Sequence, residues 1–253
     1  MTKLSFARPS TTIAEIILPA TGVLAIDDLD CLADRLERAN GDEALRVLVV
    51  RSAADVFSSG ADPAELAAID DLAGLSATVT RFFEALIGCD KILIAAVDGP
   101  CTGLGMTMLL HFDAVLATDA ARFSAPFVEL GLVPEAASTL LAVRRFGYLR
   151  AFDIFCGGGE IDAAEAMSIG LVGEHVARGE LLAIARERAS RLARKPAAAL
   201  AATRRLLRST EEARARCRTE IELFEECLRS AATRRRLALV GHRRTTERRE
   251  AAA

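Results

Sequence analysis

Two turns built from small residues constrain this chain more than any other feature of its sequence. The first is Ser59-Gly60-Ala61-Asp62 and the second spans residues 99–105; each follows an apolar run and leads into an amphipathic one. A strand that turns through glycines into a helix leaves backbone N–H groups unpaired at the start of that helix. Such groups bind anions and partly negative oxygens. The pattern therefore predicts strand–turn–helix units with two backbone donors that could meet at one oxygen.

Apolar runs alternate with segments of helical period along most of the chain. Residues 13–18, 45–50 and 92–97 are near-continuous apolar runs, which are typical of parallel strands covered on both faces. From residue 180 onward, Ala, Arg, Glu and Leu dominate with helical spacing that breaks at Pro196. We therefore expect an α/β core in residues 1–195, followed by a C-terminal helical extension in residues 196–253.

Composition narrows the class of partner and the compartment. The 253 residues include 32 basic and 35 acidic side chains, for a formal charge of −3, which favours neither a nucleic acid nor a membrane surface as partner. The six cysteines form no C-x-x-C pair and have no histidine at metal-ligand spacing. We expect a small-molecule ligand, no metal, buried reduced thiols and a cytoplasmic location, because neither a signal peptide nor a membrane span is evident.

The first turn has a complete structural explanation. Asp62 is a natural N-cap, Pro63 suits the first helical position, and Glu65 has the spacing of a capping box. A functional interpretation adds to this one. Gly60-Ala61 lies just ahead of the helix, where the N–H of Ala61 could face a ligand oxygen with the helix dipole behind it.

The second turn resembles a dinucleotide-binding loop only in part. Gly103-Leu104-Gly105 follows a strand and opens a helix, but no third glycine follows at the required spacing. The region around Phe123 also lacks an acidic residue that could bind a ribose. What remains is a backbone N–H at Leu104, at the start of a buried helix.

These motifs together resemble those of the crotonase, or enoyl-CoA hydratase/isomerase, superfamily. The resemblance covers nearly the whole chain and rests on Phe57-Ser58-Ser59-Gly60-Ala61-Asp62, residues 96–105, His111-Phe112-Asp113, Ala163-Ala164-Glu165-Ala166 and Gly170-Leu171-Val172. It implies a spiral of ββα units with a helical C-terminal region that assembles homotrimers or dimers of trimers. It also implies an acyl-CoA thioester as the substrate, with coenzyme A as part of that substrate and no separate cofactor.

The resemblance assigns the two turns to one oxyanion hole. On this match the N–H groups of Ala61 and Leu104 hold the thioester carbonyl oxygen. Preorganised donors of this kind stabilise the negative charge that develops when a proton beside the thioester is removed. The neighbouring turn residues are expected to contact the substrate: Gly60, Asp62, Gly103 and Gly105.

Hydratases of this family use two glutamates to hold and deprotonate a water molecule. The positions that match them here are Thr107 and Phe127. Neither side chain can act as a general base near neutral pH. The resemblance therefore argues against ordinary hydration of a double bond.

A different carboxylate is available at Glu135. We expect Val133-Pro134 to open a helix with Glu135 in its first turn, where an acid complements the helix dipole. The segment also resembles the peroxisomal type of Δ3,Δ2-enoyl-CoA isomerase, whose single catalytic glutamate follows the matching proline. This implies that Glu135 moves a proton from C2 to C4 of a 3-enoyl thioester. A helix N-terminus would lower the pKa of Glu135 and an apolar pocket would raise it, so both effects remain open.

Phe127, Phe82 and Phe83 are candidates for the acyl pocket, although each also suits a hydrophobic core.

Two other functions remain open. The chain could be another crotonase-type hydratase or lyase, although Asp62 and Asp98 are better explained as turn and cap residues than as its acid. It could also be a non-catalytic acyl-CoA-binding protein that kept the two turns and lost efficient chemistry.

Overall fold

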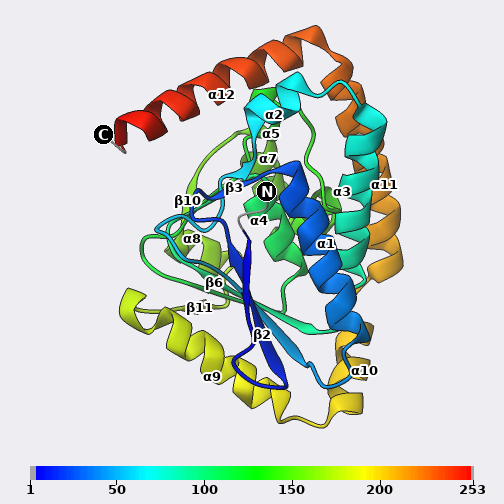
Figure 1. Ribbon diagram of the computed structural model, residues 1–253, viewed down its shortest axis with the longest axis vertical. Coiled ribbons are helices and arrows are strands. Elements are labelled where there is room, and N and C mark those ends of the chain that lie inside the picture. Colours follow the sequence, from blue (N-terminus) through cyan, green and yellow to red (C-terminus); the bar gives the residue numbers. More distant parts are fainter. Residues whose placement is uncertain (1–3, 252–253) are drawn as a thin grey trace.

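A six-stranded sheet forms the centre of the molecule (Figure 1). The computed structural model describes residues 4–251, and the side chains of residues 4–243. Only the first strand of the sheet is antiparallel to its neighbour; the others pair in parallel. The strands, in order across the sheet, are β1 (Ser5–Ala7), β2 (Ile13–Leu18), β4 (Val47–Ser52), β6 (Ile92–Val97), β8 (Ala114–Ala117) and β11 (Glu174–His175). The expected α/β fold is confirmed.

Two small sheets hold the turns that the sequence singled out. The first pairs β3 (Val23–Leu24) with β5 (Gly60–Ala61) in parallel. The second has the order β10 (Ile161–Asp162), β9 (Arg122–Ser124) and β7 (Pro100–Thr102). An isolated bridge between Ser58 and Cys101 links the two turn regions. The small sheets therefore bring together turns that lie far apart in the sequence.

Helices cover both faces of the central sheet. On one face, α1 (Ile26–Gly41), α3 (Leu72–Ile87) and α11 (Thr210–Arg229) pack side by side (Figure 1). On the other face lies α9 (Leu181–Ala193). Successive side chains of a strand point to opposite faces, so Leu48 packs in the core under α1 and α3, whereas Val47 packs under α9.

The remaining helices complete the α/β core and form the C-terminal region. The last helix, α12 (Ala231–Ala251), lies across α2 (Pro63–Ala68) of the same chain. The others are α4 (Leu104–Met108), η1 (Leu109–His111), α5 (Phe127–Leu130), α6 (Ser138–Phe146), α7 (Tyr148–Cys156), α8 (Ala163–Ser168), η2 (Arg178–Glu180) and α10 (Ala197–Leu207).

The helices that follow Pro196 share one hydrophobic core with the rest of the chain. That core includes Leu4 near the N-terminus and Leu237 on α12. The expected boundary after residue 195 falls in the turn between α9 and α10, and residues 252–253 of the expected extension lie outside the described residues. The C-terminal helices are therefore in place to contribute side chains to a site in the core.

All six cysteines are free thiols. Cys89, Cys101 and Cys217 are buried, but Cys156 is exposed at the end of α7, so the expectation of buried thiols is wrong at that position. Within residues 4–251, no helix combines the length and the apolar character needed to cross a membrane.

Candidate active site

The two glycine turns lie directly against each other. Gly60 has a φ of 75°, in the left-handed region that favours glycine. A Cβ at Gly60 would lie 2.9 Å from the carbonyl oxygen of Thr102 and 3.3 Å from the amide nitrogen of Leu104. The N–H of Thr102 donates to the carbonyl of Ser58 at 2.7 Å. Glycine at position 60 therefore permits the approach that brings the second turn beside the first.

Ala61 and Leu104 line one pocket together with Glu135. Leu104 is the first residue of α4, so its N–H has no acceptor within that helix. Ala61 ends β5, immediately before the N-cap of α2. Both residues lie at the start of a helix, where backbone N–H groups and the helix dipole favour a negative atom.

The four neighbouring turn residues have different positions. Gly103 lines the pocket, whereas Gly60, Asp62 and Gly105 lie outside its lining. A Cβ at Gly105 would lie 2.6 Å from Cβ of Ser58, so this glycine lets α4 pack on the first turn. Gly60 and Gly105 shape the meeting of the two turns, and the expectation that they contact substrate stays a prediction.

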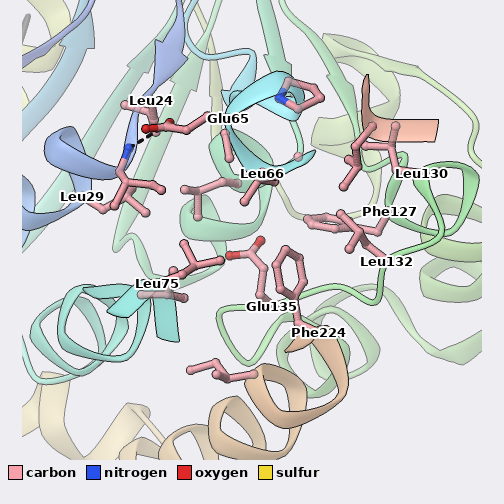
Figure 2. A pocket seen from close by; sticks show the side chains of 18 of the residues that line it. Leu24, Leu29, Glu65, Leu66, Leu75, Phe127, Leu130, Leu132, Glu135 and Phe224 are labelled. Atoms are coloured by element: carbon pink, nitrogen blue, oxygen red, sulfur yellow. Dashed lines mark hydrogen bonds between the residues drawn. The ribbon is translucent and has the colours of Figure 1, made fainter. Parts of the chain in front are cut away.

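Asp62 caps α2, as the sequence predicts. Its Oδ1 accepts the N–H of Ala64 at 2.8 Å, and Pro63 occupies the first helical position. The expected capping box is absent, because Glu65 does not turn back to its own helix. Its Oε2 accepts the N–H of Ile26 at 3.2 Å, at the start of α1 (Figure 2). Glu65 lines the pocket, and burial raises its pKa.

Glu135 lies in a loop, not in the first turn of a helix. The prediction that Val133-Pro134 opens a helix is wrong, since α6 begins only at Ser138. Ala136 and Ala137 have left-handed φ values of 61° and 57°, which interrupt any helix at this point. Nε2 of the buried His111 lies 2.6 Å from the carbonyl oxygen of Ala136 and helps to fix this unusual loop.

The carboxylate of Glu135 points into the middle of the pocket, between Leu75 and Phe224 (Figure 2). The residue is only 6% exposed, and Oγ1 of Thr107 donates to its Oε1 at 2.7 Å. Burial raises the pKa of Glu135 to about 8; the Thr107 hydrogen bond opposes this shift and the charge of Glu220 adds to it. Of the two effects that the sequence left open, burial therefore prevails.

The rest of the pocket is largely apolar. Its walls come from segments that are far apart in the sequence, including α1, α3, α5, α11 and α12. The apolar side chains that line it include Leu24, Ile26, Leu29, Leu66, Leu75, Val79, Phe83, Phe127, Leu130, Leu132, Ile221, Phe224 and Leu237. Such walls suit a hydrocarbon chain.

Of the three phenylalanines considered for the acyl pocket, Phe83 and Phe127 line it. Phe82 is absent from the lining; both Phe82 and Phe83 are 1% exposed and belong to the core, with ring centroids 5.3 Å apart. Adjacent residues on a helix point about 100° apart, so only one of the two can face the pocket. The assignment of Phe82 to the pocket is therefore wrong.

One buried residue near Glu135 escaped the sequence analysis. Glu220, on α11, accepts hydrogen bonds from Thr139, and its negative charge raises the pKa of Glu135. A signal for it exists, because Glu220 interrupts an otherwise apolar stripe on α11 that includes Ala213, Cys217 and Ile221. A charge inside an apolar stripe indicates either a buried partner or a functional role.

Among the described residues, no group of three or more His, Cys, Asp or Glu side chains could hold a metal ion. The polar groups that the pocket offers are backbone N–H groups, hydroxyls and the carboxylates of Glu65, Glu135 and Glu225. The arrangement can stabilise charge on one oxygen and move a proton close to it.

Known proteins resemble this chain over nearly its whole length. Residues 22–251 match the family model described as enoyl-CoA hydratase/isomerase. A 2,3-dehydroadipyl-CoA hydratase from Escherichia coli (strain K12) is 35% identical over 181 residues, which are 72% of this chain and 71% of that protein. Peroxisomal enoyl-CoA delta isomerase 3 from Mus musculus is 35% identical over 144 residues, which are 55% of this chain and 45% of that protein.

The fold is also similar to that of a solved enoyl-CoA hydratase/isomerase. The crystal structure of an enoyl-CoA hydratase/isomerase from Pseudoalteromonas atlantica T6c superposes with a TM-score of 0.88 and 32% identity, over 96% of this chain and 98% of that one. The relatives thus include both hydratases and isomerases at similar identity.

Proposed function

Because the chain belongs to the enoyl-CoA hydratase/isomerase family and has the crotonase fold, we propose that it is a Δ3,Δ2-enoyl-CoA isomerase with Glu135 as its single base. One observation carries this proposal. Glu135 is a buried carboxylate with a raised pKa, and it lines the same pocket as Ala61 and Leu104.

The proposed reaction moves one proton and one double bond. The N–H groups of Ala61 and Leu104 donate to the carbonyl oxygen of a 3-enoyl thioester. Glu135 removes a proton from C2, and the electron pair spreads over the carbonyl oxygen and the double bond as a dienolate. The protonated Glu135 then returns the proton at C4, so that the double bond lies between C2 and C3. Losing one oxyanion donor typically costs about 3 to 4 kcal/mol of barrier.

The environment of Glu135 suits both halves of this reaction. A group that first accepts and then donates a proton works best when its pKa is close to the operating pH. An ordinary glutamate would be too weak a base, but burial brings the pKa of Glu135 to about 8. The single hydroxyl donor from Thr107 keeps the carboxylate oriented.

The pocket favours an uncharged acyl chain. Among the described residues, no Lys, Arg or His side chain lines it, whereas Glu65 and Glu225 do. A second carboxylate at the end of an acyl chain would lose its hydration and face like charges there. We therefore expect simple 3-enoyl thioesters to be better substrates than thioesters of dicarboxylic acids.

The test is conversion of a 3-enoyl-CoA to the conjugated 2-enoyl-CoA, followed by the ultraviolet absorbance of the product. Glu135→Gln should abolish turnover and leave thioester binding, measured by calorimetry, nearly intact. Glu160→Gln is the matched control, because Glu160 is an exposed glutamate in a loop. Turnover retained in Glu135→Gln would remove Glu135 from the role of base.

Hydration of a 2-enoyl-CoA is the second candidate function, and the position of Glu65 in the pocket favours it. Glu65 places another carboxylate with a raised pKa in the pocket, and two carboxylates can hold and activate a water molecule. Formation of 3-hydroxyacyl-CoA from a 2-enoyl-CoA, lost in Glu65→Gln, would support hydration. Binding of both thioesters without turnover of either would instead support a non-catalytic acyl-CoA-binding protein.

A further inference from the structure

Helix α6 follows directly on the loop that carries Glu135, and it has no capping side chain of its own. Its N-cap residue is Ala137, which offers no acceptor for the free N–H groups of the first turn. The acceptor comes from α11. Oε1 of Glu220 accepts the N–H of Thr139 at 2.9 Å and the hydroxyl of Thr139 at 2.6 Å. Glu220 therefore caps α6 from another helix.

The segment between Glu135 and α6 is strained. Ala136 and Ala137 both have left-handed φ values, which residues with a Cβ adopt at a cost. Such conformations persist only where surrounding contacts hold them. Two contacts do so here: His111 binds the carbonyl of Ala136, and Glu220 binds Thr139 at the far end. Removing either contact frees the segment to relax and to move the Glu135 side chain.

Glu220 lies behind this segment, outside the pocket. It is 3% exposed and absent from the pocket lining, although its neighbour Ile221 is part of that lining. Within the described part of the chain, its Oε2 and Oγ of Ser138 are buried without a partner at hydrogen-bond distance, although the backbone N–H of Ala137 also lowers the pKa of this carboxyl. An acid with an unpaired buried oxygen is costly for stability. A glutamate at this position therefore calls for a role besides packing.

Given the proposed function of Glu135, we propose that Glu220 is a positioning residue for that base: its carboxylate caps α6 and fixes the strained segment that holds Glu135 in the pocket. Glu220 touches neither the substrate nor the reacting atoms. It acts through the backbone of residues 136–139. The C-terminal helix α11 thereby contributes to the chemistry as well as to the pocket wall.

The charge of Glu220 has a second consequence. Burial raises the pKa of Glu220 to about 7, and the hydrogen bonds from Thr139 oppose that shift. Its negative charge in turn raises the pKa of Glu135. Two buried carboxylates coupled in this way titrate as a pair, so changing one must move the titration of the other.

Other titratable groups face the pair. Burial and both carboxylates raise the pKa of the Cys217 thiol, which therefore stays protonated, and burial lowers the pKa of His111 to about 4, which keeps it neutral. Arg216 lowers the pKa of Glu220 and contacts Oγ1 of Thr139 at 3.2 Å. Glu65 and Glu225 line the same pocket as Glu135, but the charge that raises the pKa of Glu135 is that of Glu220.

Three variants test the proposal. Glu220→Gln keeps an oxygen that can accept from Thr139 and removes the charge, whereas Glu220→Ala removes both. Glu222→Gln is the control, because Glu222 is exposed on the same helix. Two readouts are needed: kcat and KM against pH for a 3-enoyl-CoA, and the titration of the Glu135 carboxyl by carbon-13 NMR, assigned by its absence in Glu135→Gln.

Glu220→Gln should move both the acid limb of kcat and the Glu135 titration to lower pH by about one unit, since a neighbouring like charge is gone. Glu220→Ala should lower kcat about tenfold or more with KM changed less than about twofold, as expected when a base is misplaced. Glu222→Gln should match the wild type in both measurements. These results would support the positioning role.

The proposal is overturned if Glu220→Ala folds and keeps the kcat of the wild type, because Glu135 would then hold its position without the cap on α6. That outcome is distinct from a failure of the proposed function. If the wild type converts no 3-enoyl-CoA, the isomerase assignment fails, while the NMR titration still decides whether Glu220 acts on Glu135. Should Glu220→Ala not fold, the near-isosteric Glu220→Gln decides the question by the same titration.

Discussion

The hydroxyl of Thr107 donates to Oε1 of Glu135 across 2.7 Å, and both side chains are buried. This bond joins α4, which begins at the second glycine turn, to the loop that carries the proposed base. A hydrogen bond to the ionised form of a carboxylate favours that form. Thr107 therefore limits how far burial can raise the pKa of Glu135.

Replacing Thr107 by Val should weaken the proposed base at neutral pH. Without the donor, the pKa of Glu135 rises further, so the acid limb of kcat should move up by about one pH unit and the rate near pH 7 should fall about tenfold. The measurement is the pH profile of 3-enoyl-CoA isomerisation. Thr107→Ser, which keeps the hydroxyl, is the control and should retain the wild-type profile. An unchanged profile in Thr107→Val would show that the bond has no influence on the reacting form.

The raised pKa of Glu135 also makes stability depend on pH. The folded chain keeps this carboxyl protonated up to a pKa of about 8, whereas an ordinary glutamate ionises above about 4.5. Between these values the folded state binds more protons than the unfolded state. The free energy of unfolding should therefore fall as the pH rises through this window, at up to about 1.4 kcal/mol per pH unit.

Glu135→Gln should remove most of that slope and be more stable than the wild type near pH 8. Urea denaturation at about pH 5 and about pH 8 measures both effects. Glu220 contributes a smaller slope of the same sign, since its pKa is raised to about 7. A wild-type stability that rises steadily from pH 5 to about pH 8 would contradict the burial of Glu135 as an acid.

Local signals in the sequence predicted much of this architecture. The apolar runs at 13–18 and 92–97 are β2 and β6, because strands buried on both faces favour near-continuous apolar runs; in β2 the run is interrupted by Glu15. Asp62 caps α2 by accepting the N–H of Ala64, two residues further along the chain, so the sequence signal for this cap is local too. Neither feature depends on a residue distant in the sequence.

What the sequence could not predict depends on distant partners. The proline before Glu135 is typical of a helix start. Contacts from His111 and Glu220 instead hold Ala136 and Ala137 in left-handed conformations, so the segment is a loop. Glu65 has capping-box spacing, yet the N–H that it binds belongs to Ile26 of another helix. Which side chain reaches which backbone group is decided by tertiary packing.

His111 should be needed for the position of Glu135. Burial lowers the pKa of His111 to about 4, so the ring is neutral at physiological pH. Because the carbonyl of Ala136 can only accept, Nε2 must carry the proton of their 2.6 Å bond. His111→Phe keeps the ring and leaves that carbonyl unpaired, which should cost about 1 to 3 kcal/mol of stability.

The same variant should lower kcat for 3-enoyl-CoA more than it changes KM, since the base and not the acyl pocket is disturbed. Denaturation and steady-state kinetics measure the two effects. His175→Phe is the control, because His175 is a half-exposed histidine on β11 that pairs with Asp119 at the surface. If His111→Phe is as active as this control, the contact with Ala136 does not position Glu135.

An ion-pair cluster around the buried Glu15 should hold α9 on the sheet. Glu15 of β2 is fully buried and contacts Nε of Arg51 at 2.9 Å and Nε of Arg186, on α9, at 2.5 Å. Burial alone would raise the pKa of Glu15, but hydrogen bonds from the two arginines outweigh it and lower the pKa. Because the Arg51 and Arg186 side chains are 21% and 46% exposed and keep part of their hydration, Glu15→Gln should cost about 1 to 2 kcal/mol of unfolding free energy at neutral pH.

That cost should shrink in acid. A lowered pKa means that the ion pairs stabilise the fold above the ordinary glutamate pKa and are lost as the pH falls through the folded value. Urea denaturation at neutral and acidic pH would follow the narrowing gap between wild type and variant. Glu187→Gln, at an exposed position on α9, should change stability little. An equal effect of the two substitutions would contradict the role of Glu15.

Helix α7 exposes an apolar face that we expect to be a subunit interface. Tyr148, Leu149 and Phe152 are 66%, 78% and 51% exposed, and clusters of large apolar side chains on a protein surface commonly mark contacts with a partner. The family resemblance implies a homotrimer or a dimer of trimers. Leu149→Asp should dissociate it, because a charge in an apolar interface loses its hydration without gaining a partner. Light scattering should give three or six times the chain mass for the wild type and a smaller assembly or one chain for the variant. Leu206→Asp tests the alternative interface, since Leu206 is an exposed leucine on α10, in the C-terminal region to which the resemblance assigns assembly. Dissociation by Leu206→Asp alone would place the interface on α10 and not on α7.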